Sequence, residues 1–435
     1  MKNEGVKIMF KKGFIAFISI LVLVLAGCST SNNGESSSKK GNGDQVVVDI
    51  FQFKVEFKNQ FEEVAKKYEE KNPNVKINIE TVGGGNDYAG ALKAKFSSGN
   101  EPAIFNIGGP ADIKEYEDRL TDLSDTNSVG QALPSTLESV TVDGEIYGLP
   151  YNQEGYGFVY NTEVFEKAGV DSTSIQTMED LVDAVEKIDN KKDELGLDAV
   201  FAMAGKELWT EGQHGANLFI ASDFNDSALE AFDAKELPFE KANQFKTYID
   251  LQNEYSVQPV VSLDYSKQVE ELFSTGRVAM VQQGNWIYPT VEQMDPELAG
   301  KVDLLPIPVD GEMKIPVGVA NYWAVNAKVS EEQQAAARDF LDWLYTSDEG
   351  KEIVLSEFKF IPAYDGYDTD KISDPLSKRV YEYAQAEKTI GWAFKGFPTG
   401  WTDVMGANLQ KYLADEATWE ETIDASKAKW AELRK

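Results

Sequence analysis

The residue types that carry covalent or metal chemistry are scarce in this sequence. The chain has one histidine, His214, and one cysteine, Cys28. A Ser-His-Asp site would have to use His214 alone, and zinc or copper sites need several thiolates or imidazoles. The 73 Asp and Glu residues become catalytic only as pairs with a spacing and an environment that a sequence does not reveal. We therefore expect no catalytic residue, no metal site and no cofactor.

Two further motifs are weak indicators of ligand chemistry. Residues 83–86, Gly-Gly-Gly-Asn, lack the Lys-Ser/Thr of a P-loop and the spacing of a dinucleotide-binding loop, so they indicate a turn. Asp365, Asp368 and Asp370 carry oxygen ligands that suit calcium, but the EF-hand pattern is absent. A solvated acidic loop is the favoured interpretation, and calcium binding stays open.

The sequence is better supplied with groups that bind without reacting. Planar aromatic rings cover the C–H faces of a polyhydroxylated ligand, while amides and carboxylates bond to its hydroxyls. Four of the eight tryptophans sit beside Gly, Pro, Thr or Asn near expected element ends: Trp209, Trp286, Trp392 and Trp401. His214, close to Trp209 in sequence, is either a donor in the same site or a surface residue. These residues favour non-covalent capture of a ligand rich in hydroxyl groups.

Candidate polar residues follow the expected strands. In open α/β sheets ligands gather beyond the carboxyl ends of the strands. The residues at such positions, or just before the strand at 157–160, are Gln52, Phe53, Asp112, Asn152, Gln153 and Glu154. Tyr322 and Trp323 alternate along another strand, so only one of them faces a cleft, and we favour Tyr322.

The hydrophobic pattern predicts alternating strands and helices in the first third of the chain. The expected elements are strands at 46–51, 75–79 and 103–107, with helices at 57–72 and 88–96 between them. Residues 162–275 are largely helical in pattern, strands return at 278–282, 302–307 and 317–325, and the remainder is helical. Capping boxes are predicted at Thr177/Asp180, Ser330/Gln333 and Thr418/Glu421. The order predicts a parallel sheet with crossover helices, followed by a second region richer in helix.

The N-terminus predicts export and membrane anchoring. Lys7, Lys11 and Lys12 precede an apolar run, Gly13 to Gly27, that is short for a membrane span, so residues 1–27 are interpreted as a signal peptide. The run ends in Leu-Ala-Gly before Cys28, which resembles the lipobox of bacterial lipoproteins. This resemblance implies lipidation of Cys28, with residues 28–44 as a flexible tether on the extracellular face of the cytoplasmic membrane, and it suits a Gram-positive host.

The negative net charge and the small number of arginines limit the kinds of ligand and partner that the chain can bind. The formal net charge of −31 repels nucleic acid, so we expect no nucleic-acid partner. The chain has five arginines, and three of them, Arg277, Arg338 and Arg434, precede a strand or lie on helices. Few guanidinium groups are therefore left to clamp an anionic ligand, and a neutral ligand is favoured.

Several stretches in a fixed order resemble one protein family. They are YEEKNP at 68–73, YGLP at 147–150 with GFVYN at 157–161, FSTGRVAM at 273–280, GNW at 284–286, and FL with TSDEG within 340–350. Together they resemble the family 1 extracellular solute-binding proteins, which include maltose-binding and multiple-sugar-binding lipoproteins. The resemblance implies an α/β, two-lobe fold of the periplasmic-binding-protein (type II) kind, with a hinge and a helix-rich second lobe. The lobes would comprise 45–155 with 280–330, and 156–279 with 331–435.

The same resemblance implies a function and its partners. The chain is expected to be a monomer that captures a neutral oligosaccharide and delivers it to the transmembrane subunits of an ABC importer. Trp209, Trp286 and Trp401 would match the aromatic platforms of the maltose-binding relatives. A lipoprotein that captures a polyamine or another small solute is the alternative, since aromatic rings and carboxylates also hold cations. A surface glycoside hydrolase is the distant alternative, and the length and linkage of the sugar stay open.

Overall fold

The computed structural model describes residues 45–82 and 87–435. The predicted signal peptide (1–27), the lipidated Cys28 with its tether (28–44) and the glycine motif (83–86) lie outside the described residues. Within the described ranges, none of the helices is both long and apolar enough to cross a membrane.

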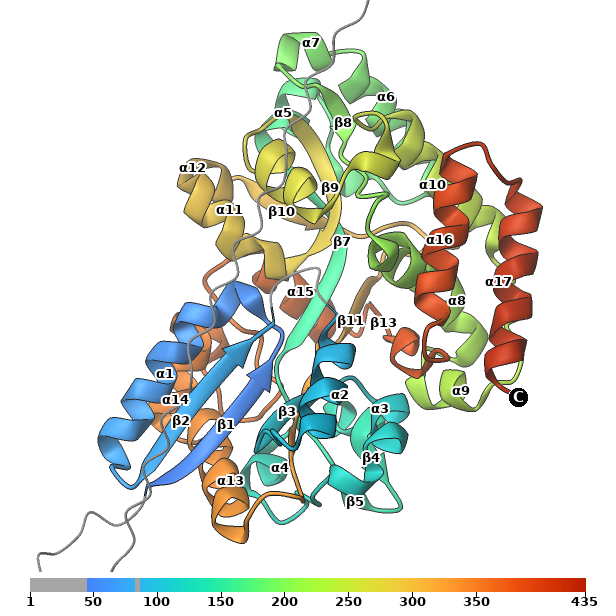
Figure 1. Ribbon diagram of the computed structural model, residues 1–435. Coiled ribbons are helices and arrows are strands. Elements are labelled where there is room, and N and C mark those ends of the chain that lie inside the picture. The colour runs from blue at the N-terminus through green and yellow to red at the C-terminus, as the bar shows by residue number, and fades with distance from the viewer. Residues whose placement is uncertain (1–44, 83–86) are drawn as a thin grey trace, which may run out of the picture. The chain divides into compact units, whose positions relative to one another are not determined.

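The first sheet has the strand order β2-β1-β3-β12-β6 (Figure 1). Its strands are β2 (Val75–Thr81), β1 (Val46–Gln52), β3 (Ile104–Ile107), β12 (Tyr322–Val325) and β6 (Leu149–Pro150). β1 is parallel to β2 and β3, whereas β12 runs antiparallel to β3 and β6. The parallel part follows from the predicted alternation of strands and helices.

The core of the first sheet is covered by helices from two distant parts of the chain. α1 (Lys58–Lys71) buries Phe61, Val64 and Tyr68, which recur at helical spacing. α13 (Glu331–Thr346) and α14 (Asp348–Ser356) bury apolar residues in the same cluster, and Figure 1 shows them beside α1. Residues 331–356 therefore complete the core of a sheet whose first strands lie near residue 50.

The second sheet is built around the long strand β7. Its strands are β13 (Thr389–Ile390), β11 (Ile315–Val319), β7 (Gln153–Asn161), β9 (Val278–Gly284), β8 (Ala199–Phe201) and β10 (Val302–Leu305). β7 pairs antiparallel with β9 on one edge, and with β11 and then β10 on the other.

Helices pack on this sheet in a second, larger core. The main ones are α5 (Thr162–Ala168), α6 (Met178–Asp189), α8 (Ala216–Ile220), α10 (Ala242–Glu254), α11 (Tyr288–Met294), α15 (Pro375–Gln385), α16 (Trp401–Leu413) and α17 (Trp419–Leu433). Their buried faces, with those of β7 and β9, form one continuous hydrophobic cluster. Each sheet thus has its own core, as expected for two separately packed layers.

Three segments of chain pass between the two sheets. The first leads from β6 to β7, the second from β11 to β12, and the third runs through Ile361. They are bonded to one another, since the Gln153 N–H donates to the Ile361 carbonyl at 2.9 Å and the Ala320 N–H donates to the Asn152 carbonyl at 3.3 Å. Side chains at these crossings lie where both cores can contact them.

The local predictions agree well with the structure. The strands expected at 46–51, 75–79, 103–107 and 278–282 are β1, β2, β3 and β9, and the three capping boxes are present. The expected strand at 317–325 is interrupted, because Ala320 and Asn321 separate β11 from β12 at a crossing. β8 has three residues inside the region predicted to be helical, a length at which no period is readable.

The packing divides the chain differently from the predicted lobes. Residues 331–364, assigned to the second lobe, contribute to the core of the first sheet. Residues 280–309, assigned to the first lobe, contribute to the core of the second sheet. The sequence of an amphipathic helix shows that one of its faces is buried. It does not show which of two sheets that face covers, because this depends on tertiary packing.

Candidate functional site

Five aromatic side chains meet beside the crossing segments. They are Tyr156, His214, Trp286, Trp392 and Phe394, and we call them the aromatic cluster. The His214 ring stacks on Tyr156 at 4.4 Å between ring centres, and lies 5.4 Å from both Trp286 and Phe394. Trp392 lies 5.0 Å from Phe394 and 6.1 Å from Tyr156. All five are buried.

Trp286 is held in one orientation by its own strand end. The Trp286 indole N–H donates to Oε1 of Gln283 at 2.8 Å, and the Gln283 amide donates to Oε1 of Gln268 at 2.7 Å. The ring lies so close over Gly284 that a Cβ there would be 2.2 Å from Cζ3 of the indole. Only glycine leaves room for this packing, which places the ring beside Tyr156, the residue paired with Gly284 on β7.

Asn217 on α8 connects the other members of the cluster. Its side-chain amide donates to the Tyr156 hydroxyl at 3.2 Å and to the Gly391 carbonyl at 3.1 Å. Its Oδ1 accepts from the backbone N–H of Phe394 at 3.1 Å. A single buried side chain thereby fixes β7 to the segment that carries Trp392 and Phe394.

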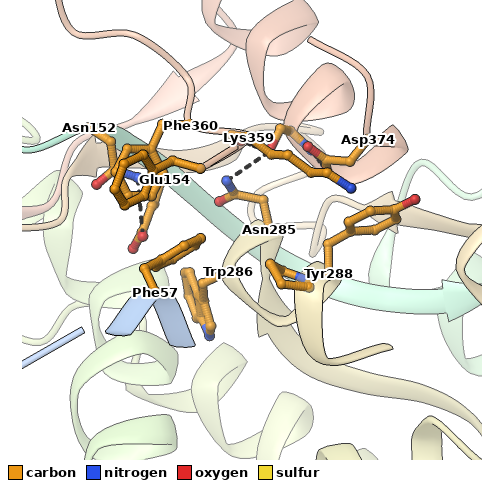
Figure 2. A pocket seen from close by; sticks show the side chains of 12 residues that line it. Phe57, Asn152, Glu154, Asn285, Trp286, Tyr288, Lys359, Phe360 and Asp374 are labelled. Atoms are coloured by element: carbon orange, nitrogen blue, oxygen red, sulfur yellow. Dashed lines mark hydrogen bonds between the residues drawn. The ribbon is translucent and has the colours of Figure 1, made fainter. Parts of the chain in front are cut away.

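A polar wall borders the cluster. Nζ of Lys54, which follows β1, lies 2.5 Å from Oε1 of Glu154 on β7, and both side chains are buried. The Asn152 amide donates to the same carboxylate oxygen at 3.2 Å. Figure 2 shows Asn152 and Glu154 close to Phe57 and Trp286. The ion pair joins the first sheet to the strand that leads into the second.

A second lysine and carboxylate lie on another side of the site. Nζ of Lys395 donates to the Ala320 carbonyl at 2.5 Å, and Oδ2 of Asp112 accepts from the Gly108 N–H at 2.6 Å. Burial lowers the pKa of Lys395 to about 8, opposed by the charges of Asp112 and Glu154. Burial also raises the pKa of Asp112, opposed by the Gly108 N–H and the Lys395 charge. Each group thus feels the opposite charge of the other.

His214 is neutral at physiological pH. Burial lowers its pKa to about 3, and the positive charges of Lys395 and Lys54 act in the same direction. The imidazole therefore offers one donor and one acceptor rather than a charge.

Three buried polar atoms around the cluster lack a hydrogen-bond partner within the part of the chain that the structure describes. They are Nδ1 of His214, Nε1 of Trp392 and Oδ1 of Asn152. Buried polar atoms in proteins nearly always have a partner, because leaving one unpaired costs about 1–3 kcal/mol. Oδ1 of Asn152 can accept a hydrogen bond, the Trp392 indole N–H can donate one, and Nδ1 of His214 can do either according to its tautomer. These atoms, beside aromatic faces, are suited to bond ligand hydroxyls.

The space beside Trp286 is narrow in this structure. A cavity of about 10 Å³ is lined by Phe57, Asn152, Glu154, Asn285 and Trp286, among others (Figure 2). That volume accommodates about one water molecule. A ligand of the size of a sugar ring does not fit in this volume.

The structure brings several predicted site residues together. Asn152, Glu154, His214 and Trp286 are within the aromatic cluster or its polar wall. The Trp209 ring stands edge-on to His214 at 5.2 Å and is partly buried, at the border of the cluster.

Two predicted ligand platforms are core residues instead. Trp401 is fully buried between α16 and α17, where its indole N–H donates to the Ser426 carbonyl at 2.8 Å. Tyr322 packs in the core on one face of the first sheet, and Trp323 packs on the other face, stacked on Tyr151. The alternation was correctly predicted, but both faces of this sheet are covered, so neither ring faces the cluster.

The remaining predicted residues support the site from outside it. Gln52 uses its amide to bond Thr81 and the backbone of Lys54, and Gln153 donates to the Pro362 carbonyl at 2.7 Å. Phe53 stands edge-on to Tyr88, on the first sheet. Asp112 holds the turn at Gly108 and lies at the edge of the site, near Lys395.

Sequence reasoning missed three members of the site: Tyr156, Phe394 and Lys395. It named Trp392 among the tryptophans near element ends but did not assign it as a ligand platform. Trp392 follows a glycine, the same signal that selected Trp401, and nothing in the local sequence ranks one above the other. Tyr156 lies in a strand buried on both faces, and Lys395 carries no motif. Among residues 45–82 and 87–435, no group of three or more His, Cys, Asp or Glu side chains is placed to hold a metal ion.

Two sheets with separate cores, joined by three crossings with an aromatic and polar site beside them, define a two-lobe binding protein. Comparison with known proteins identifies the family. The family described as bacterial extracellular solute-binding protein matches residues 63–378. This chain belongs to that family.

Individual relatives agree with this assignment. The melibiose/raffinose/stachyose-binding protein MelE of Bacillus subtilis (strain 168) is 23% identical over 416 residues, covering 93% of this chain and 92% of its own. A chitin oligosaccharide binding protein of known structure has a TM-score of 0.75 at 26% identity, covering 90% of this chain and 100% of its own. The raffinose complex of RafE has a TM-score of 0.74 at 18% identity over the same shares of the two chains. These matches confirm the predicted two-lobe α/β fold.

Proposed function

We propose that this protein captures a neutral oligosaccharide outside the cytoplasm and delivers it to the permease of an ABC importer. The observation that carries the proposal is the aromatic cluster, with Nδ1 of His214, Nε1 of Trp392 and Oδ1 of Asn152 buried beside it. Aromatic faces and unpaired polar atoms together match the C–H faces and hydroxyls of a pyranose. The names of its relatives, which include binding proteins for raffinose-type and chitin-type oligosaccharides, support the same ligand class.

The charges in the site favour a neutral ligand over a cation or an anion. Glu154 is already bonded to Lys54, and Asp112 faces the charge of Lys395. A polyamine would compete with two resident lysines for these carboxylates, and an anionic sugar would have to displace the carboxylates from the lysines. Either exchange buries a charge without its partner, which is strongly unfavourable. A sugar hydroxyl can bond to both partners of a pair without breaking it.

Capture would proceed by separation and closure of the two lobes. The narrow cavity beside Trp286 requires opening before a sugar enters, and the sugar then favours the closed form through contacts made to both sides. We assign the lobes by their cores: residues 45–151 with 319–364 form the first, and residues 156–309 with 376–435 form the second. Lipid anchoring at Cys28, a monomeric state and a Gram-positive host belong to this proposal. No catalytic step is part of it, in keeping with relatives that are solute-binding proteins.

Titration calorimetry tests the ligand class. The full-length protein, in a detergent without a sugar headgroup, is titrated with raffinose, stachyose, and malto-, xylo-, fructo- and chito-oligosaccharides. Spermidine and a uronic-acid oligomer are the charged comparisons, and each sugar is recovered after overnight incubation. Micromolar or tighter binding of an intact neutral sugar supports the proposal. Binding of spermidine alone supports the polyamine alternative, and cleavage of any sugar supports the hydrolase.

A further inference from the structure

Gly318, on β11, lies directly under the indole of Trp392. A Cβ built at Gly318 would be 2.5 Å from Cγ, 2.6 Å from Cδ2 and 2.9 Å from Cβ of Trp392. All three of these nearest atoms belong to that one side chain. Atoms at such distances overlap, so the indole rests on bare backbone, and any side chain at 318 would occupy its place.

The requirement for glycine here concerns space and not backbone conformation. Gly318 is not among the residues with positive φ, so its backbone suits alanine. Other glycines near the site are less specific. A Cβ at Gly284 would meet the Gly155 carbonyl oxygen at 2.4 Å as well as Trp286, and a Cβ at Gly155 would meet Val380 and Ile315. At Gly318 alone among these three, the nearest atoms all belong to a tryptophan of the cluster.

We propose that Gly318 is a positioning residue that sets the height of the Trp392 indole in the aromatic cluster and thereby determines sugar affinity. The inference rests on the proposed function. Ordinary van der Waals contact begins near 3.4 Å, so alanine at 318 displaces Cγ of Trp392, now 2.5 Å from the Cβ position, by about 1 Å. The indole then moves relative to Phe394, whose ring centre lies 5.0 Å away, and its free Nε1 moves with it. Binding groups need to be held within about 0.5 Å of the productive geometry.

The pairing of β11 fixes the position of Gly318, and through Gly318 the position of Trp392, which lies 74 residues later in the chain. β11 crosses from the second sheet toward the first, and its pairing with β7 fixes Gly318 opposite Glu154. The position of the Trp392 indole is therefore fixed relative to β7, the strand that carries Glu154 of the Lys54–Glu154 pair. The stacking surface and the polar wall are therefore held at a fixed distance from each other. A sugar whose shape does not match that distance loses contacts on one side, which lowers its affinity relative to a sugar that fits.

A double-mutant cycle tests the inference on the full-length protein. Calorimetry compares wild type, G318A, W392G and G318A/W392G with the tightest-binding sugar of the panel. We expect G318A to weaken binding at least about tenfold, because the displacement exceeds the tolerance of a preorganised site. The double variant should bind as W392G does, because W392G removes Cβ together with the indole and leaves the alanine at 318 nothing to displace. Additive losses, or unchanged affinity in G318A, would overturn the proposal.

A measurement without sugar separates this proposal from the proposed function. G318A should lower the thermal unfolding midpoint of the wild type but leave that of W392G unchanged or higher, because W392G removes all three side-chain atoms that lie nearest to a Cβ at 318. Gly130, which is exposed in α4 (Asn127–Gln131) and has nothing within 4 Å of its Cβ position, provides the matched control. G130A should leave affinity unchanged and should not lower the midpoint, because alanine favours a helix over glycine. If wild type binds no sugar, the proposed function fails, while the thermal cycle still decides whether Gly318 positions Trp392. Equal destabilisation by G318A in both backgrounds would refute the positioning role.

Discussion

The neutral state of His214 makes the stability of this protein depend on pH in a defined direction. The pKa of His214 is lowered from 6.5 to about 3 by burial and by the charges of Lys395 and Lys54. As pH falls through 6.5, the unfolded chain takes up a proton at this residue and the folded chain does not. The contribution of neutral His214 is therefore fully present above pH 6.5 and is lost progressively as pH falls toward 3. Between pH 7.5 and pH 5 the loss amounts to about 2 kcal/mol.

Other buried groups titrate in the same range, so the prediction is a difference between two proteins. Burial raises the pKa of Glu211 to about 7 and that of Asp374 to about 6, which strengthens folding as pH falls. His214→Phe keeps a ring on Tyr156 and removes only the titration at 214. Its urea unfolding, followed by tryptophan fluorescence, is compared with wild type at pH 7.5 and pH 5.

The expected result is that the stability difference between wild type and His214→Phe shifts by about 2 kcal/mol in favour of the variant at the lower pH. A difference that stays constant across this range would refute the reasoning. It would mean that His214 is protonated or solvated in the folded protein, and that the site is not the dry aromatic cluster described above.

Three substitutions test separate parts of the site. Trp286→Ala should weaken sugar binding by about 30-fold or more in calorimetry, as loss of a buried aromatic anchor does; unchanged affinity would move the site elsewhere. Trp401→Phe should lower the unfolding midpoint, because the bond to Ser426 is lost, yet leave affinity within about twofold; a large affinity loss would return Trp401 to the site. Glu154→Gln should lower the free energy of unfolding by about 3 kcal/mol or more in urea, because Lys54 is left buried without its partner. Lys54→Met combined with Glu154→Gln should recover most of that loss, and failure to recover would show that the pair is not coupled.

Local signals in the sequence predicted most of the secondary structure. The capping boxes at Thr177, Ser330 and Thr418 depend on side chains three residues apart, so tertiary packing does not alter them. The strand β1 and the helix α1 were readable from their periods for the same reason. The sequence did not reveal which sheet α13 covers, because the apolar face of this helix is equally compatible with either core.

The site was predictable in part. Asn152 and Glu154 stand at a crossing, where polar residues have few roles other than contact with a ligand or with another lobe. Trp286 lies two residues after the end of β9. The choice between Trp392 and Trp401 depended on what packs against each glycine-flanked ring. Trp401 meets α17, whereas Trp392 meets the bare backbone of Gly318, and both contacts come from distant parts of the chain.

A crystal structure with the bound sugar tests the central claim most directly. The account predicts a sugar ring against the aromatic cluster. Nδ1 of His214, Nε1 of Trp392 and Oδ1 of Asn152 should each lie about 3 Å from a sugar oxygen. A sugar bound elsewhere, with these three atoms still without a ligand partner, would contradict it.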